Sequence, residues 1–302
     1  MSFYYLREEM GLVLNDILNR VCFNNKEYSK NDIAVTWINY KVENNHLGTG
    51  FGFGINNKKL IYPASIVKLV YGLATYSWIK TGKILLCDEI SNAVYKMLFY
   101  SSNDATSFLV DLLSGTTSGP CLDGVSWENW KYQRAIINDW LKDLNWDELY
   151  GINCCQKTWD DGPFGREKEF YGYDNTNRNR NRMTTDSTAK ILEEIILNNN
   201  YQENNLDLKS FLKRSLNKDI LKKDSLNQVD GFLGEGLPDD TNFWSKAGLM
   251  SKVRHDAAWW KNSGSLQTLL VVFGNGKKYY EDTSLFPSIA REVYAYNKNW
   301  FI

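Results

Sequence analysis

The hydrophobic positions change period several times along the chain, and each change predicts an element. Apolar residues recur at helical spacing between residues 3 and 20, which indicates an amphipathic helix. The β-branched and aromatic run at 33–40 then predicts a strand. After a polar turn, the segment 49–55 reads as the returning strand of a hairpin.

Helical spacing dominates the middle of the chain. A long apolar-periodic run follows Pro63 and extends to Lys80, and proline is favoured at the start of a helix. Between 150 and 183 the chain is instead rich in Gly, Asn and Arg, and we interpret it either as a solvated loop or as a functional lid. Further helices are expected near residues 88–99, 103–114, 127–143 and 186–197.

The C-terminal part returns to strand-like patterns and closes with a helix. Helical spacing of Ile289, Val293 and Tyr296 supports that last helix. We expect the preceding strands to be antiparallel and to join the N-terminal hairpin in one sheet. These strands are predicted at about 241–247, 253–261 and 266–274.

The order of these elements predicts a single domain, 1–302, with an α/β (α+β) fold. About five antiparallel strands would form a sheet flanked by helices, with a helical subdomain alongside. The α/β subdomain is expected to comprise 1–62 and 236–302, and the helical subdomain 63–235.

The composition excludes several classes of function. The chain has 302 residues, 43% of them hydrophobic, which argues against a disordered protein. Its 35 basic and 36 acidic residues give a net charge of −1, so neither nucleic acid nor an anionic membrane is an expected partner. No apolar run is long enough for a membrane span, and no secretory signal is visible, which favours the cytoplasm, or the periplasm if a leader is missing.

His46 and His255 are the only histidines, so no metal site or cofactor is expected.

A first candidate for chemistry stands at the head of the run that follows Pro63. Ser65 and Lys68 are three residues apart, which places them on one face of a helix. A serine hydroxyl becomes a good nucleophile when a base removes its proton, and a buried lysine with a lowered pKa can be that base. An ordinary helix start explains the same pair, so the spacing alone is weak evidence.

Two further short motifs carry groups of the right kind. Ser101 and Asn103 lie at a loop-to-helix junction, where a hydroxyl can relay a proton and an amide can orient a neighbour. Helix capping is the alternative interpretation. Lys246 and Gly248 lie on a predicted strand, where the lysine could hold an anionic group and the glycine could let a ligand approach the strand edge. A solvated surface lysine is the alternative there.

The combination and order of these motifs resemble the penicillin-recognising serine hydrolases, most closely the class A β-lactamase group. The sequences YPASIVKL, YSSNDATSF and KAGLMSKVRHDAAWW resemble the nucleophile helix, the SDN loop and the KTG strand of that family. The segment MTTDSTAKILEEI resembles the turn that follows its omega loop. The likeness extends over about 3–298, with a divergent stretch between about 115 and 180.

The resemblance implies a role for each motif residue. Ser65 would be acylated and Lys68 would be its base or proton relay. Ser101 would pass a proton to the leaving nitrogen, Asn103 would orient Lys68 and the substrate, and Lys246 would anchor an anionic group.

The resemblance also implies a substrate-binding strand. Ala247, Gly248 and Leu249 are expected to line the substrate, and the main-chain N–H groups of Ser65 and Leu249 would form the oxyanion hole. Arg254, on the next strand, is either a ligand for a substrate carboxylate or a surface residue of the strand.

Three departures from the family pattern affect the expected activity. Ser102 replaces the usual Asp, and Ala247 replaces a residue whose hydroxyl meets the β-lactam carboxylate. No omega-loop signature with the glutamate that activates water precedes Met183. Glu167 and Glu169 are candidates for that role by their positions in the chain. Acylation is therefore better supported than deacylation.

We therefore predict a serine hydrolase that acts through an acyl-enzyme, with β-lactamase-like amide hydrolysis. The substrate would be a small amide or ester that carries a carboxylate, and the protein would be a monomer. The alternatives are a D,D-peptidase or esterase relative, and a non-hydrolytic penicillin-binding sensor that deacylates slowly.

Overall fold

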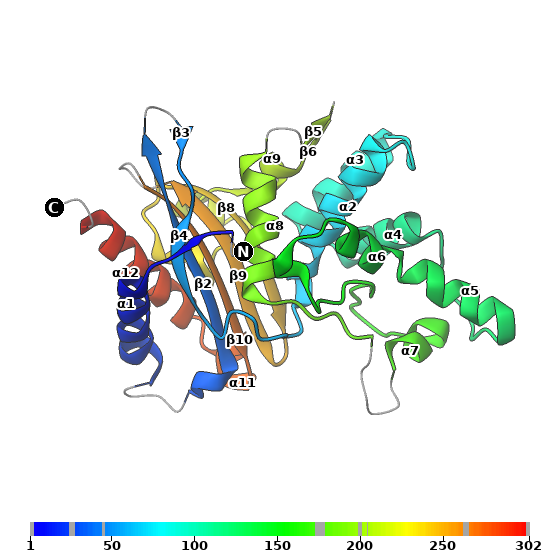
Figure 1. Cartoon of the computed structure of the whole chain (residues 1–302), viewed down its shortest axis with the longest axis horizontal. Coiled ribbons are helices and arrows are strands. Elements are labelled where there is room, and N and C mark those ends of the chain that lie inside the picture. The colour runs from blue at the N-terminus through cyan, green and yellow to red at the C-terminus, as the bar shows by residue number, and fades with distance from the viewer. Residues whose placement is uncertain are drawn as a thin grey trace.

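The computed structural model has a sheet between two layers of helices, and a mainly helical part extends to one side (Figure 1). The α/β (α+β) class predicted from the sequence is confirmed. No helix within the described ranges is long and apolar enough to span a membrane. The structure describes residues 3–23, 28–43, 46–172, 179–198, 201–203, 205–261 and 266–299.

Five long antiparallel strands make up most of the sheet, in the order β4-β2-β10-β9-β8. Short strands extend it: β1 pairs in parallel with β4, β7 pairs with the start of β8, and β3 pairs with β2. Strands β5 and β6 form a small separate sheet. The bounds are β1 (Tyr5–Leu6), β2 (Ile33–Glu43), β3 (His46–Leu47), β4 (Phe51–Ile55), β5 (Gln202–Glu203), β6 (Leu206–Asp207), β7 (Lys213–Arg214), β8 (Asn242–Met250), β9 (Val253–Lys261) and β10 (Leu266–Asn275).

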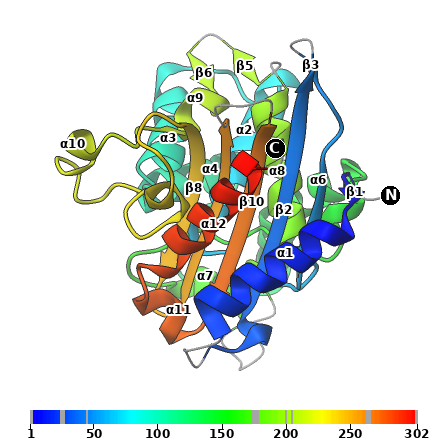
Figure 2. The same cartoon turned by 90° about the vertical axis from the view of Figure 1, so that its left-hand side faces the viewer.

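Helices cover both faces of this sheet. Figure 2 shows α1 and α12 crossing one face, and α8 lies on the other, with α2 beyond it (Figure 1). The bounds are α1 (Glu8–Leu18), α2 (Lys68–Lys80), α3 (Asp88–Phe99), α4 (Asn103–Ser114), α5 (Gly124–Arg134), α6 (Ile136–Asp143), α7 (Gly165–Tyr171), α8 (Thr185–Leu197), α9 (Leu208–Leu212), α10 (Lys218–Leu221), α11 (Lys277–Glu281) and α12 (Leu285–Asn299).

The alternation of side chains along the strands divides the hydrophobic core in two. On β9, Ala258 and Trp260 pack toward α1 and α12, whereas Ala257 and Trp259 pack toward α2 and α8. Because both faces are covered, β9 is buried almost throughout and its sequence shows little polar alternation.

Two sequence expectations differ from the structure. The helix expected at 127–143 is two helices, because the chain bends at Ala135 between α5 and α6. The stretch 150–183 is not only loop, because it contains α7, and residues 173–178 lie outside the described part. The proposed subdomain boundaries remain a prediction.

Candidate active site

The predicted nucleophile stands in a tight turn that runs directly into α2. A 3₁₀ turn covers Ala64–Val67, and Lys68 is the first residue of the helix. Residues three apart eclipse each other in a 3₁₀ turn, which sets Ser65 and Lys68 on one side. Ala64 has a φ of +47°, a strained value for a residue with a side chain, and such strain concentrates at functional sites.

Lys68 is fully buried and its amine is surrounded by acceptors. Its Nζ donates to the main-chain oxygen of Ser101 at 2.5 Å and to Oδ1 of Asn103 at 2.8 Å. Burial lowers the pKa of Lys68 to about 7, although the charge of Asp160 opposes this shift. In the neutral amine those two shorter bonds use both N–H groups, so the lone pair can accept a proton from a hydroxyl, and the hydroxyl of Ser101 lies 3.2 Å from this nitrogen.

Ser101 lies between two lysine amines. Its Oγ accepts from Lys68 Nζ at 3.2 Å and from Lys246 Nζ at 3.0 Å, which joins α2 to β8 through one hydroxyl. Ser101 has a φ of +59°, so it is a second strained residue at this site. The three motifs found in the sequence therefore converge.

Lys246 has a second side-chain partner that the sequence did not indicate. Its Nζ donates to Oε1 of Gln228 at 2.6 Å, and the main-chain N–H of Ala247 donates to the same oxygen at 3.3 Å. Gln228 in turn donates to the carbonyl of Phe99 at 2.6 Å. Burial, together with the positive charge of neighbouring Lys68, holds the pKa of Lys246 well below its ordinary value.

The end of β8 lies directly against the turn that carries Ser65. A Cβ added at Gly248 would stand 2.8 Å from the carbonyl oxygen of Pro63 and 3.3 Å from the nitrogen of Ile66. Gly248 is therefore required for this close approach of two backbones, rather than only for a ligand. It also brings the main chain of Leu249 beside the nucleophile turn.

Arg254 is not directed at a substrate. Arg254 lies four residues before Ala258 on β9, so both side chains point to the same face of the sheet, the one that carries α12. Its guanidinium donates to the carbonyls of Gly231 at 2.9 Å and Tyr280 at 2.7 Å. Arg254 is only 5% exposed, so the interpretation as a surface residue is wrong, and these main-chain contacts do not fit the carboxylate-binding role either.

Asn103, at the N-terminus of α4, is bonded to a carboxylate that the sequence analysis did not identify, that of Asp160. Ser102 is the N-cap of this helix, because its Oγ accepts from the N–H of Ala105 at 3.1 Å. This leaves Asn103 facing Lys68 through Oδ1, while its Nδ2 donates to Oδ1 of Asp160 at 2.6 Å. Asp160 lies in the divergent stretch, and no pattern in the sequence singled it out.

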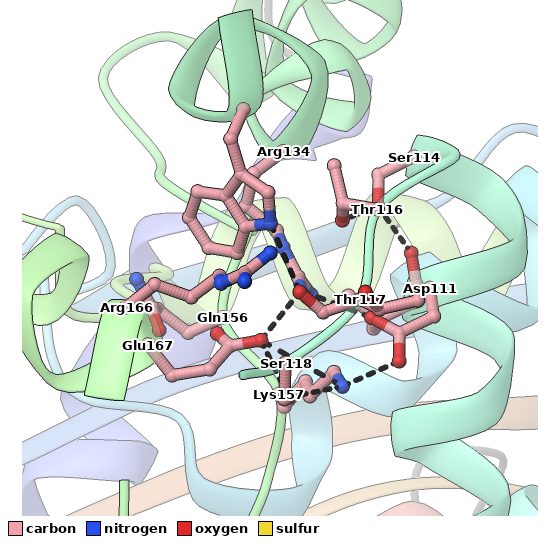
Figure 3. Close-up of polar contacts among 12 residues, drawn as sticks. Asp111, Ser114, Thr116, Thr117, Ser118, Arg134, Gln156, Lys157, Arg166 and Glu167 are labelled. Carbon is pink, nitrogen blue, oxygen red and sulfur yellow. Dashed lines mark hydrogen bonds and ion pairs between the residues drawn. The ribbon is translucent and has the colours of Figure 1, made fainter. Parts of the chain in front are cut away.

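Glu167 does not face the nucleophile. Its Oε1 accepts from Arg134 at 2.5 Å and from the hydroxyl of Ser118 at 2.9 Å (Figure 3). Lys157 and Asp111 complete this buried cluster, at 2.6 Å from each other. The cluster ties α4 and α5 to the chain between Lys157 and α7, so its role is to anchor that segment. Glu169, the other candidate, is exposed.

The other chemical groups of the chain are placed elsewhere. His255 is buried, donates from Nε2 to the Tyr62 carbonyl at 2.9 Å, and has a pKa lowered to about 4 by burial. It is therefore a neutral structural group. Cys154 and Cys155 are buried thiols. Among the described residues, no group of His, Cys, Asp or Glu side chains is arranged to hold a metal ion.

The hydroxyl in contact with the Lys68 amine is that of Ser101, whereas Ser65 lies one turn before Lys68 on the same side of the chain. An amine of lowered pKa close to a serine is suited to acyl transfer, because it can take a proton as a hydroxyl attacks a carbonyl. Comparisons with known proteins show the family and the fold. A family model described as the beta-lactamase enzyme family matches residues 88–297. No curated protein matches the sequence.

Solved structures with a similar fold include a β-lactamase from Chitinophaga pinensis (13% identity, TM-score 0.64), which covers 96% of this chain and 99% of its own. The structure of PBP-A is similar over 98% of both chains, at 12% identity and a TM-score of 0.59. A PBP-A mutant in an acyl-enzyme complex with penicillin G matches over 96% of this chain and 97% of its own, at 12% identity and a TM-score of 0.61. At these identities the likeness concerns the fold.

Proposed function

The chain belongs to the β-lactamase enzyme family, and from this premise we propose that it is a serine hydrolase that forms an acyl-enzyme on Ser65. The observation that carries the proposal is the amine of Lys68, buried and held by Ser101 and Asn103 one turn after Ser65. The substrate is a small amide or ester, with β-lactams as the class that the family suggests.

In the acylation step, neutral Lys68 takes the hydroxyl proton while Ser65 Oγ attacks the substrate carbonyl. The main-chain N–H groups of Ser65 and Leu249 stabilise the resulting oxyanion, and the contact of Gly248 with Pro63 supports this pairing. Ser101 then passes a proton to the leaving group and is resupplied by Lys68 or Lys246, whose amines both bond its Oγ.

Asp160 is the carboxylate that we assign to deacylation. Its hydrogen bond to Asn103 supports a position close to Lys68. In that step a water molecule attacks the acyl carbonyl and Asp160 takes one of its protons. The same proton then passes from Asp160 to Lys68 and on to Ser65 Oγ as that oxygen leaves the acyl carbon. The free acid and the starting enzyme result.

The test compares the chain with its Asp160→Asn variant on p-nitrophenyl acetate. We expect steady turnover from the natural chain, and from the variant one equivalent of nitrophenol followed by turnover slower by about 100-fold, since a general base contributes at least that much. Equal turnover after the burst would refute the role of Asp160. A lack of any acyl adduct on either protein would refute the proposed function.

The same measurement with nitrocefin distinguishes a β-lactamase from a penicillin-binding sensor. Sustained turnover supports β-lactam hydrolysis, and a single stoichiometric burst supports the penicillin-binding sensor.

The acylation rate should depend on pH through Lys68. Because only the neutral amine accepts a proton, and its pKa is lowered to about 7, the acylation rate constant should rise with pH between about 6 and 8 and then level off. Burst rates of p-nitrophenyl acetate, corrected with Ser65→Ala, would measure this. A rate that stays flat over that range would exclude Lys68 as the base.

A further inference from the structure

The contacts around Lys246 bear on which acyl donors the site accepts. Both Lys246 Nζ and the Ala247 N–H already donate to one acceptor, Oε1 of Gln228. An anionic group of a substrate would have to displace this amide to reach the same donors. Gln228 is also held at its other end, by the Phe99 carbonyl, so it is fixed in place.

The two arginines on the neighbouring strands β7 and β9 both donate to main-chain carbonyl oxygens. Arg254 donates to the carbonyls of Gly231, Tyr279 and Tyr280. Arg214 donates to the carbonyl of Leu98 at 2.7 Å and is buried. Neither guanidinium faces a substrate at Ser65.

A negative charge lies on the other side of the site. Asp160 is exposed and bonds Asn103 at 2.6 Å, while Asn103 contacts Lys68. A carboxylate on the substrate would therefore meet a like charge as it approached, which disfavours binding. An uncharged substrate meets no such repulsion.

Apolar side chains are exposed next to two of the motifs. Tyr100, directly before Ser101, is 59% exposed, and Leu249 and Met250 at the end of β8 are each 46% exposed. Tyr100 and Gln228 also line a cavity of about 90 Å³, together with the apolar Leu226 and the charged Arg214 and Asp224. Exposed apolar side chains beside these motifs suit a ligand with an apolar part.

We propose that the site acylates uncharged, apolar esters or amides in preference to substrates that carry a carboxylate. The proposal rests on the acyl-enzyme function and specifies its substrate class. It replaces the carboxylate-bearing substrate expected from the resemblance, because Ala247 has no hydroxyl and Gln228 fills the place of the anion.

The test uses a pair of esters of similar size, p-nitrophenyl butyrate and the mono-p-nitrophenyl ester of succinic acid. Their burst rates on the full chain, corrected with Ser65→Ala, give the two acylation rate constants. We expect the butyrate to react at least about tenfold faster, the minimum effect of losing one hydrogen bond to a charged group. A smaller ratio, or a faster succinate, would overturn the substrate preference while leaving the acyl-enzyme intact.

Gln228→Ala should expose the donors of Lys246 and Ala247, and so bring the ratio of the two rates toward one. Ser225→Ala, an exposed position on the same loop, is the control and should leave the ratio unchanged. An unchanged ratio in Gln228→Ala would overturn the role of Gln228. If neither ester forms an adduct with the natural chain, the proposed function fails together with this inference.

Discussion

Ser65→Ala is expected to abolish the covalent adduct and to lower ester hydrolysis by at least about 10⁴-fold, because removal of the attacking group of a catalytic unit costs that much or more. No other hydroxyl in the described part of the chain stands one turn before a buried lysine whose pKa is lowered to about 7. Intact-mass spectrometry after incubation with a fluorescent penicillin and with p-nitrophenyl butyrate would measure the adduct.

The control is Ser77→Ala, on the same helix as Lys68 but about two and a half turns further along. It should form adducts at the natural rate. Adduct formation that persists in Ser65→Ala would assign the nucleophile to another residue and contradict the acyl-enzyme on Ser65.

Arg134→Met is expected to lower the free energy of unfolding by about 3–5 kcal/mol, because the buried Glu167 loses its closest ion-pair partner. Arg134 is fully buried, and its guanidinium contacts Glu167 at 2.5 Å and Asp111 at 3.0 Å. The ion pair that remains, between Lys157 and Glu167, is longer, at 3.6 Å. Denaturant unfolding followed by fluorescence would measure the loss.

Lys142→Met is the matched control, because Lys142 and Asp139 form an ion pair at 2.8 Å whose members are 75% and 50% exposed. Its removal should change the stability by less than about 1 kcal/mol. A double variant, Arg134→Met with Glu167→Leu, should recover part of the loss, since it removes both charges. Equal losses in Arg134→Met and Lys142→Met would show that the cluster does not anchor its segment.

The sequence indicated the residues that the structure brings together better than it indicated their surroundings. Lys68, Ser101 and Lys246 have side chains whose chemistry made them candidates, and the structure places them in contact. Their catalytic roles, and that of Ser65, stay predictions. Their convergence follows from strands and helices that hydrophobic periodicity already predicted, including β8 and the start of α2.

The residues that hydrogen-bond or ion-pair with these side chains, and so fix their orientation, were not predictable from the sequence. Gln228 and Asp160 lie in irregular segments, where no period relates a residue to its neighbours in space. Glu167 was a reasonable candidate by position alone, but its orientation depends on Arg134, which is 33 residues away in the chain. Likewise, Arg254 was identified on the correct strand, and only the packing of α11 and Gly231 decides where its guanidinium points.

The order of strands in the sheet has a consequence for synthesis. β2, complete by Glu43, needs β10, which begins at Leu266, as its neighbour, and the strand with Lys246 joins the sheet only through β9. During synthesis, Ser65 therefore leaves the ribosome more than 150 residues before Lys246 does. Such long-range pairing slows folding, and the contact between Lys246 and Ser101 can be held in the finished sheet only after β9 and β10 have been made.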